Sequence, residues 1–167
     1  TINVNGAVTS YVDFGGNVTA QNVNVGSIGS VQVNQDTVFT IASDFDSVGS
    51  SLTGSGTITV NANGDINLGE VDNAANLTLA NQGILYLNEN ISTIGTQGVD
   101  ISGAGITQLN DDVVINVGES GNVVLDDNMQ GAENLTIQVA QGNINLGNQS
   151  ATTQLASLTI EDSDSSL

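Results

Sequence analysis

Residues 115–128 read INVGESGNVVLDDN, and the spacing of residue types in this stretch decides the fold. Apolar residues flank Asn116, a glycine follows at position 121, and apolar residues at 123 and 125 precede two aspartates. Such alternation is the period-2 pattern of β-strands, and glycine is typical of the turn between them. The stretch therefore predicts two short strands joined at a glycine.

The same pattern recurs along the whole chain. Six copies begin with an apolar-any-apolar segment and continue to a glycine and further apolar residues; these segments are 23–25, 58–60, 77–79, 99–101, 115–117 and 135–137. Degenerate copies begin at Ile2 and Phe39, and a truncated copy begins at Leu158. The mean spacing of about 19.5 residues is typical of the coils of a solenoid.

We therefore expect an all-β fold over residues 1–167, a single parallel β-helix (β-solenoid) domain with one coil per copy. At about 4.8 Å per coil, about nine coils would form a rod roughly 43 Å long. Glycine is expected at the sharp turns because it adopts positive φ without a steric penalty. An antiparallel β-sandwich also needs alternation and frequent turns, so it stays open as the alternative.

The charge balance excludes several classes of partner. The chain has 18 acidic residues, no Lys, Arg or His, and a net charge of −18. Nucleic acid and anionic membrane surfaces would be repelled, and no 18-residue apolar run predicts membrane insertion. Without Cys or His, disulfides and the common zinc and copper ligands are absent. Cations are the small partners that this composition favours.

Acidic residues recur two positions after the apolar residue that closes a copy: Glu70, Glu89, Asp111 and Asp127. Stacked coils would place them in one column, where neighbouring like charges repel unless a cation lies between them. The strongest candidate for a Ca²⁺ site combines four carboxylates on adjacent turns: Asp111, Asp112, Asp126 and Asp127. The competing interpretation is a solvated acidic turn.

The sequence contains few of the residue types on which common catalytic mechanisms depend. Without His, Lys or Arg, nucleophilic triads lack a base and phosphoryl transfer lacks its usual cationic clamp. A two-carboxylate glycosidase mechanism is chemically possible, but no pair of acids stands out. We expect no enzyme activity, no catalytic residues and no cofactor other than Ca²⁺.

Residues 64–87 (GDINLGEVDNAANLTLANQGILYL) and 142–163 (GNINLGNQSATTQLASLTIEDS) resemble the coils of filamentous-haemagglutinin-type and autotransporter-passenger adhesins. The resemblance implies a right-handed parallel β-helix on a bacterial or similar microbial surface. It points to an extracellular structural or adhesive protein that forms a rigid rod or filament.

Three further expectations concern partners. The pattern runs to both ends without a capping helix, so the chain is expected to be one repeat or subunit of an end-to-end homopolymer. One alternative is a pilus-like β-sandwich subunit that donates residues 1–14 as a mobile strand. Another is a carbohydrate-binding β-helix that presents Tyr11 and Tyr86 to surface glycans.

Overall fold

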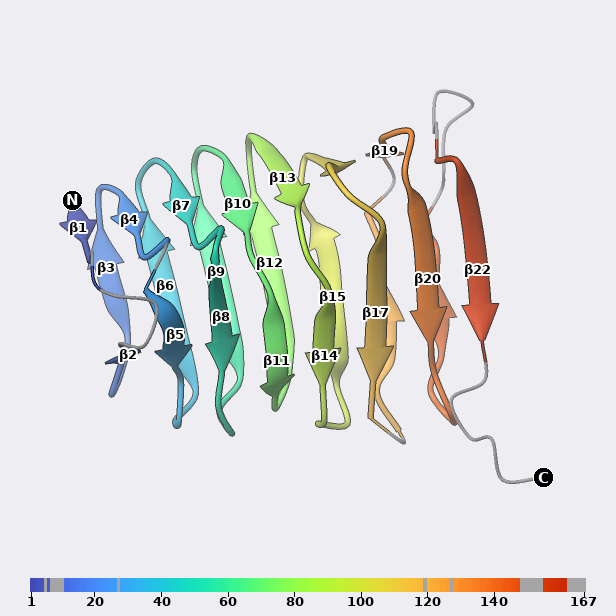
Figure 1. The fold of residues 1–167 in the computed structure, drawn as a ribbon, viewed down its shortest axis with the longest axis horizontal. Helices are drawn as coiled ribbons and strands as arrows, with labels where there is room; N and C mark the ends of the chain where they lie inside the picture. The colour runs from blue at the N-terminus through green and yellow to red at the C-terminus, as the bar shows by residue number, and fades with distance from the viewer. Residues whose placement is uncertain are drawn as a thin grey trace.

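Parallel strands account for all the regular structure that is described. The structure is a computed structural model that describes residues 1–4, 6, 11–26, 28–118, 120–126, 128–147 and 155–161. Within these ranges it contains 22 strands and no helix, wound into successive coils along one axis (Figure 1). All strand pairings are parallel, for example β9 with β12 and β17 with β20. The chain is therefore a parallel β-solenoid, and the β-sandwich alternative is wrong.

The coils stack into three sheets, and each coil contributes one strand to each sheet in turn. Sheet A contains β1 (Ile2–Asn3), β4 (Val23–Asn24), β7 (Phe45–Asp46), β10 (Ile66–Leu68), β13 (Ile84–Leu87), β16 (Ile106–Leu109) and β19 (Met129–Gln130). Sheet B contains β2 (Tyr11–Asp13), β5 (Gly29–Gln32), β8 (Ser50–Thr53), β11 (Val71–Ala74), β14 (Ile91–Thr93), β17 (Val113–Val117), β20 (Asn134–Gln138) and β22 (Ser157–Glu161). Sheet C contains β3 (Val18–Ala20), β6 (Thr37–Ile41), β9 (Ile58–Ala62), β12 (Leu77–Asn81), β15 (Gly98–Gly103), β18 (Asn122–Val124) and β21 (Ile144–Asn145). The turns that join them form three edges of the rod, here called the A–B, B–C and C–A corners.

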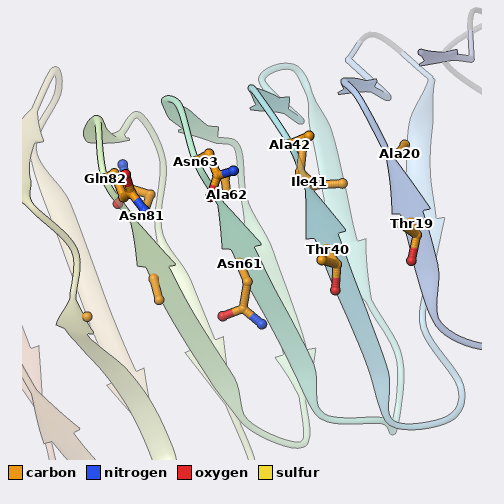
Figure 2. A pocket seen from close by; sticks show the side chains of 12 residues that line it. Thr19, Ala20, Thr40, Ile41, Ala42, Asn61, Ala62, Asn63, Asn81 and Gln82 are labelled. Atoms are coloured by element: carbon orange, nitrogen blue, oxygen red, sulfur yellow. The ribbon is translucent and has the colours of Figure 1, made fainter.

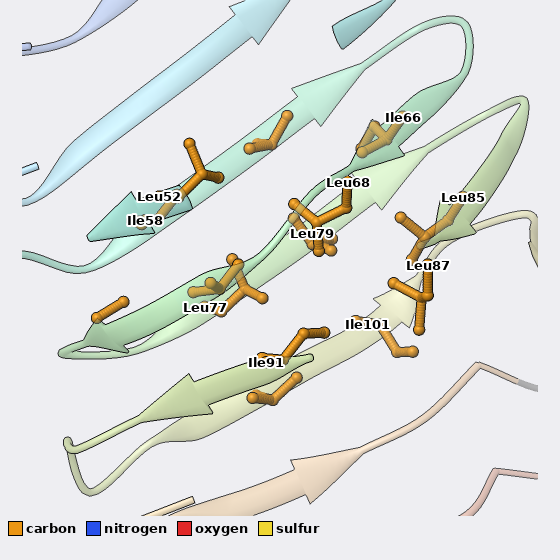
Figure 3. Packing of buried hydrophobic residues seen from close by; sticks show 14 of the residues in the cluster. Leu52, Ile58, Ile66, Leu68, Leu77, Leu79, Leu85, Leu87, Ile91 and Ile101 are labelled. Atoms are coloured by element: carbon orange, nitrogen blue, oxygen red, sulfur yellow. The ribbon is translucent and has the colours of Figure 1, made fainter. Parts of the chain in front are cut away.

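The core consists of aliphatic columns that run along the axis. In sheet A, Leu68, Leu87 and Leu109 occupy one register position on successive coils, and all three are buried. Leucines and isoleucines from the three sheets meet between them in the interior (Figure 3). Because side chains alternate across a strand, the residues between these positions face outward. The period-2 pattern of the sequence thus separates core from surface, as expected.

The number of coils is smaller than the sequence predicts. The repeated segments do not all lie in one sheet: residues 23–25 run through β4 of sheet A, residues 58–60 lie in β9 of sheet C, and residues 135–137 lie in β20 of sheet B. Two successive pairs of repeated segments are only 16 residues apart: the segment that ends at Val25 and the one that ends at Ile41, and the segment that ends at Ile101 and the one that ends at Val117. Each pair is therefore separated by about two thirds of a coil. The sheets contain seven, eight and seven strands. About seven coils at about 4.8 Å give a rod about 34 Å long.

Coil length varies while the strands keep their register. One coil takes 19 residues, from Leu52 to Val71, and another takes 24, from Ile91 to Ile115. Most of the added residues lie at the corners, and the longer coil also has one extra residue at a bulge within β15, between its pairings with Thr78 and Ala80. The corners thus absorb most of the changes in length.

Most glycines of the repeated pattern allow neighbouring coils to stack closely, and few of them adopt a positive φ. Among them only Gly29 has a positive φ, of 80°. A Cβ on Gly83 would lie 2.7 Å from the carbonyl carbon of Gly64 in the preceding coil. A side chain at this corner would therefore push neighbouring coils apart. The expectation that these glycines supply the turn conformation is wrong for most of them.

The N-terminal residues belong to the solenoid. Strand β1 pairs with β4, and β2 pairs with β5, in the same parallel arrangement as the later coils. Phe14 packs edge-on against Phe39 with ring centroids 5.2 Å apart, and Phe39 packs against Phe45 at 5.4 Å. Residues 1–14 are thus the first strands of the rod and not a mobile donor strand; residues 5 and 7–10 lie outside the described ranges.

Candidate functional site

The carboxylates predicted to bind Ca²⁺ lie at two different corners. Asp111 and Asp112 follow β16 at the A–B corner, whereas Asp126 precedes β19 at the C–A corner. These positions are at opposite ends of the sheet A strands. Asp127 lies outside the described residues. In the part of the chain that is described, no three acidic side chains are grouped to hold a metal ion. A Ca²⁺ site at these residues remains a prediction.

Asp126 differs from the other members of the predicted set because it is buried. Only 4% of its surface is exposed, and its Oδ2 accepts a hydrogen bond of 3.4 Å from Oγ1 of Thr107, which is fully buried. Its carboxylate is therefore drawn into the interior of the coil, while Asp111 and Asp112 are exposed. The sequence gives no sign of this difference, because Asp126 follows a strand just as Asp111 does.

The register of sheet A brings acidic residues of successive coils to the A–B corner. Glu70, Glu89 and Asp111 each lie two residues after the leucine that ends a sheet A strand, and these leucines stack. In the next coil, Thr107 pairs with Met129, so the position equivalent to Asp111 is Glu133. Glu133 therefore takes the place in the column that the sequence assigns to Asp127.

Most of the aspartates at the corners accept hydrogen bonds from the backbone. Asp44 Oδ1 accepts the N–H of Asp65 at 3.0 Å, and Asp65 Oδ1 accepts the N–H of Ile84 at 2.8 Å, so each carboxylate holds the coil that follows it. Nine Asp or Asn side chains, four Asp and five Asn, accept a backbone N–H of the next coil in this way among the described positions, and they are distributed over all three corners: Asn17, Asn22, Asp36, Asp44, Asp65, Asn76, Asn90, Asp112 and Asn122. Hydrogen bonding to N–H groups stabilises a carboxylate without any cation.

Asp112 illustrates this role best. Its Oδ1 accepts the backbone N–H and the side-chain Nδ2 of Asn134, both at 2.9 Å. The backbone hydrogen bond and then the side-chain hydrogen bond lower the pKa of Asp112. Asn134 is the first residue of β20, so this carboxylate fixes the start of a strand in the next coil. The structure thus explains Asp112 as a contact between coils.

The outer surface of sheet C is hollowed into a groove of about 370 Å³. It crosses β3, β6, β9, β12 and β15, and Figure 2 shows Thr19, Thr40 and Asn61 on successive strands along it. None of the residues that line it is acidic. The sequence alone does not reveal this groove, because outward residues of different coils come together only when the register is known.

The two tyrosines do not form a shared platform. Tyr11 is exposed on β2 of sheet B, and Tyr86 lies on β13 of sheet A, where it pairs with Asn67 and Gln108. Neither lines the sheet C groove. Tyr11 and Tyr86 thus lie on different sheets, and a carbohydrate site built on them stays a prediction.

The last described coil leaves apolar surface open at the C-terminal end. A cavity of about 330 Å³ there is lined mainly by leucines, among them Leu125, Leu146 and Leu155. Leu158 and Ile160 of β22 are 42% and 54% exposed. Within the described ranges, β22 has a neighbouring strand only on the β20 side. Among the described residues, an apolar interior and a strand edge without a partner thus meet at one end of the rod.

No protein-family model, no curated protein and no solved structure matches this chain. None of the described segments forms a helix long and apolar enough to span a membrane.

Proposed function

We propose that the protein is a non-enzymatic, extracellular structural or adhesive rod of the kind found in filamentous-haemagglutinin-type and autotransporter-passenger adhesins. The observation that carries the proposal is the uninterrupted solenoid with hydrogen-bonded corners. Three continuous parallel sheets enclose an aliphatic core, and Asp or Asn side chains tie each coil to the next at the corners. Such a structure resists bending, since every coil contacts its neighbours over its whole cross-section.

The amino-acid composition supports the proposed extracellular location. The chain contains no Lys or Arg, so trypsin-like proteases find no cleavage site in it. Its net charge of −18 keeps rods apart laterally. A stiff, soluble and protease-resistant spacer on a microbial surface is the function that these properties serve.

We further propose that the rods associate end to end. The C-terminal end presents Leu158, Ile160 and the edge of β22 that has no neighbouring strand among the described residues. At the other end the half-buried Ile2, Val12 and Phe14 pack against the first coils. The two ends of the rod have the same three-sheet cross-section, so the apolar interior and strand edges of one end match those of the other. Exposed strand edges pair readily with another chain.

Electron microscopy and sedimentation of the purified chain test this proposal, with Ca²⁺ and with a chelator in parallel. We expect rods that lengthen as concentration rises. Ile160→Asp should abolish the lengthening, because it places a charge on the end surface. Ile94→Asp is the matched control, because Ile94 is 61% exposed on the side of the rod.

Monomers at high concentration in both conditions, or equal association of the two variants, would contradict end-to-end assembly. Lengthening only with Ca²⁺ would mean that association requires cations to screen or bridge the negatively charged rods. Lengthening in both conditions would leave the acidic column at the A–B corner as a solvated surface. Compact, non-elongated particles would contradict the rod itself.

A further inference from the structure

We propose that the groove on the outer surface of sheet C binds an uncharged, extended oligosaccharide. This inference is independent of end-to-end assembly, because the groove lies on the side of the rod. It differs from a site built on Tyr11 and Tyr86, which lie on the other two sheets.

The first observation is the absence of charge. Strands β3, β6, β9 and β12 contain no acidic residue, although the chain has 18. Acidic residues do occur on the strands of the other sheets, for example Asp46 on β7 and Asp72 on β11. Over these four coils the groove surface is neutral within a strongly negative rod, and Asp100 on β15 is the acidic residue of the fifth strand. The lining residues therefore favour a neutral ligand over an anion.

The second observation is how the hollow is formed. One outward row of sheet C runs in register through successive coils and contains Thr19, Thr40, Asn61 and Ala80. On the next strand, β15, Gly103 pairs with Ala80. Strand β15 contains a bulge between its pairings with Thr78 and Ala80. A Cβ on Gly103 would lie only 2.8 Å from the Cβ of Ala80, so a side chain there would fill the space. Bulges of this kind are frequent beside binding sites.

The third observation is a buried polar atom with no partner. Asn81 lines the groove and is 6% exposed. Its Nδ2 donates to the carbonyl oxygen of Gly64 at 3.2 Å, but its Oδ1 has no hydrogen-bond partner among the described residues. An unsatisfied buried acceptor costs free energy. The Asn81 side chain lies in the inward row of Leu77 and Leu79, so a hydroxyl donor in the groove reaches its Oδ1 only if the side chain turns outward. A hydroxyl-rich ligand supplies such donors.

The shape of the groove favours an extended ligand. It crosses five strands, which corresponds to about 19 Å along the axis at the usual strand spacing. Threonine hydroxyls and the Asn61 amide repeat once per coil, with the methyl group of Ala80 in the same outward row and the exposed Ala42 beside it. Alternating polar and apolar contacts of this kind suit sugar rings, which have hydroxyls at their edges and C–H groups on their faces. The volume lies in the range of ligand sites.

Other occupants fit less well. An extended peptide would add to a free strand edge, but β6, β9 and β12 are each paired on both sides. A second copy of the rod would bring two charges of −18 together over a contact much smaller than the roughly 800 Å² per partner of stable interfaces. We therefore propose a neutral oligosaccharide, and not a peptide or a second rod, as the ligand of this groove.

The test is titration of the isotope-labelled chain with neutral hexasaccharides, followed by NMR. The probes are β-1,4-linked glucose, β-1,3-linked glucose, α-1,4-linked glucose and β-1,4-linked N-acetylglucosamine, with oligogalacturonate as the anionic control. We expect one neutral probe to shift amide signals of β6, β9 and β12 with a dissociation constant on the order of 1 mM, and the anionic probe to leave them unchanged.

Two variants locate the site. Asn61→Asp adds a charge to the groove without changing its shape, and Ala80→Gln fills the hollow; each should weaken binding about tenfold. Asn67→Asp makes the same change on the outer surface of sheet A and should leave binding unaltered. Circular dichroism and thermal unfolding verify that all three variants fold.

Failure of every neutral probe to bind at about 10 mM would overturn the proposal. Binding that is equal in Asn61→Asp and Asn67→Asp would also overturn it, because the site would then lie elsewhere. A change in oligomeric state on Ala80→Gln without any saccharide would overturn it in favour of a contact between copies of the chain.

Discussion

Strands β20 and β22 contain the same tripeptide in two different environments. Leu135-Thr136-Ile137 pairs residue by residue with Leu158-Thr159-Ile160 in sheet B. Leu135 and Ile137 are fully buried, whereas Leu158 and Ile160 are 42% and 54% exposed. The two strands differ in their neighbours: β20 lies between β17 and β22, whereas among the described residues β22 pairs with β20 alone. Burial in this fold is therefore produced by the next coil and not by the local sequence.

The contrast can be measured directly with paired alanine substitutions, which should give the largest effect. Ile137→Ala leaves a cavity inside a column of isoleucines and should lower the free energy of unfolding by about 2–5 kcal/mol. Ile160→Ala removes a side chain that is half exposed and should cost less than about 1 kcal/mol. Denaturant unfolding of both variants measures the difference. Equal losses would mean that β22 is covered in solution.

A second experiment changes polarity inside sheet B without changing shape. Thr93 is buried, and its Oγ1 has no partner among the described residues; the aligned residue of the next coil is Val117. Thr93→Val should therefore stabilise the fold by about 1 kcal/mol. Thr37→Val is the matched control and should destabilise, because Thr37 Oγ1 donates to the carbonyl oxygen of Gln35 at 3.0 Å. Stabilisation by both would refute the hydrogen-bond explanation.

A third experiment removes the contact that fixes the start of β20. Asp112→Ala deletes the acceptor for both hydrogen bonds of Asn134 and should lower the melting temperature, by less than Ile137→Ala because Asp112 is exposed. Asp111→Ala removes the same charge but only a local hydrogen bond to the backbone of Asp112. A larger effect of Asp111→Ala would show that charge repulsion, and not the contact between coils, dominates at this corner.

The smallest effect should be a dependence of stability on pH. The pKa of Asp112 is lowered in the folded state by its hydrogen bonds to Asn134. Its contribution to stability is therefore fully present above the unfolded pKa of about 3.9 and is lost as the pH falls through the lowered value. The melting temperature of Asp112→Asn should fall less than that of the wild type between pH 6 and pH 2. Parallel curves would contradict this linkage.

The sequence predicts the fold class because its signal is periodic. Alternation identifies the inward positions. An error of two residues in register still leaves each side chain on the correct face of its strand, as when the sequence aligns Ile41 with Val60 although Ile41 pairs with Ala62. The number of coils was overestimated because all three sheets use the same aliphatic pattern. A step from one sheet to another therefore resembled a short coil.

The candidate site was less predictable for a related reason. Asp112 contacts Asn134, which is 22 residues away, and pairs at this separation can be assigned only when the length of each coil is known. A usable signal did exist, because Asp or Asn recurs just before many strands at intervals of about one coil. The neutral groove had no such signal, since it depends on a bulge in β15.

The stacking of thin coils also makes the protein a polyelectrolyte. A charge of −18 on about seven coils, each about 4.8 Å high, corresponds to about one charge per 2 Å of axis. Double-stranded DNA carries one charge per roughly 1.7 Å and condenses a layer of counterions for that reason. A rod with nearly the same linear charge density should hold a mobile sheath of cations along its whole length, so its stiffness and its spacing from neighbouring rods will follow the ionic strength of the surrounding medium.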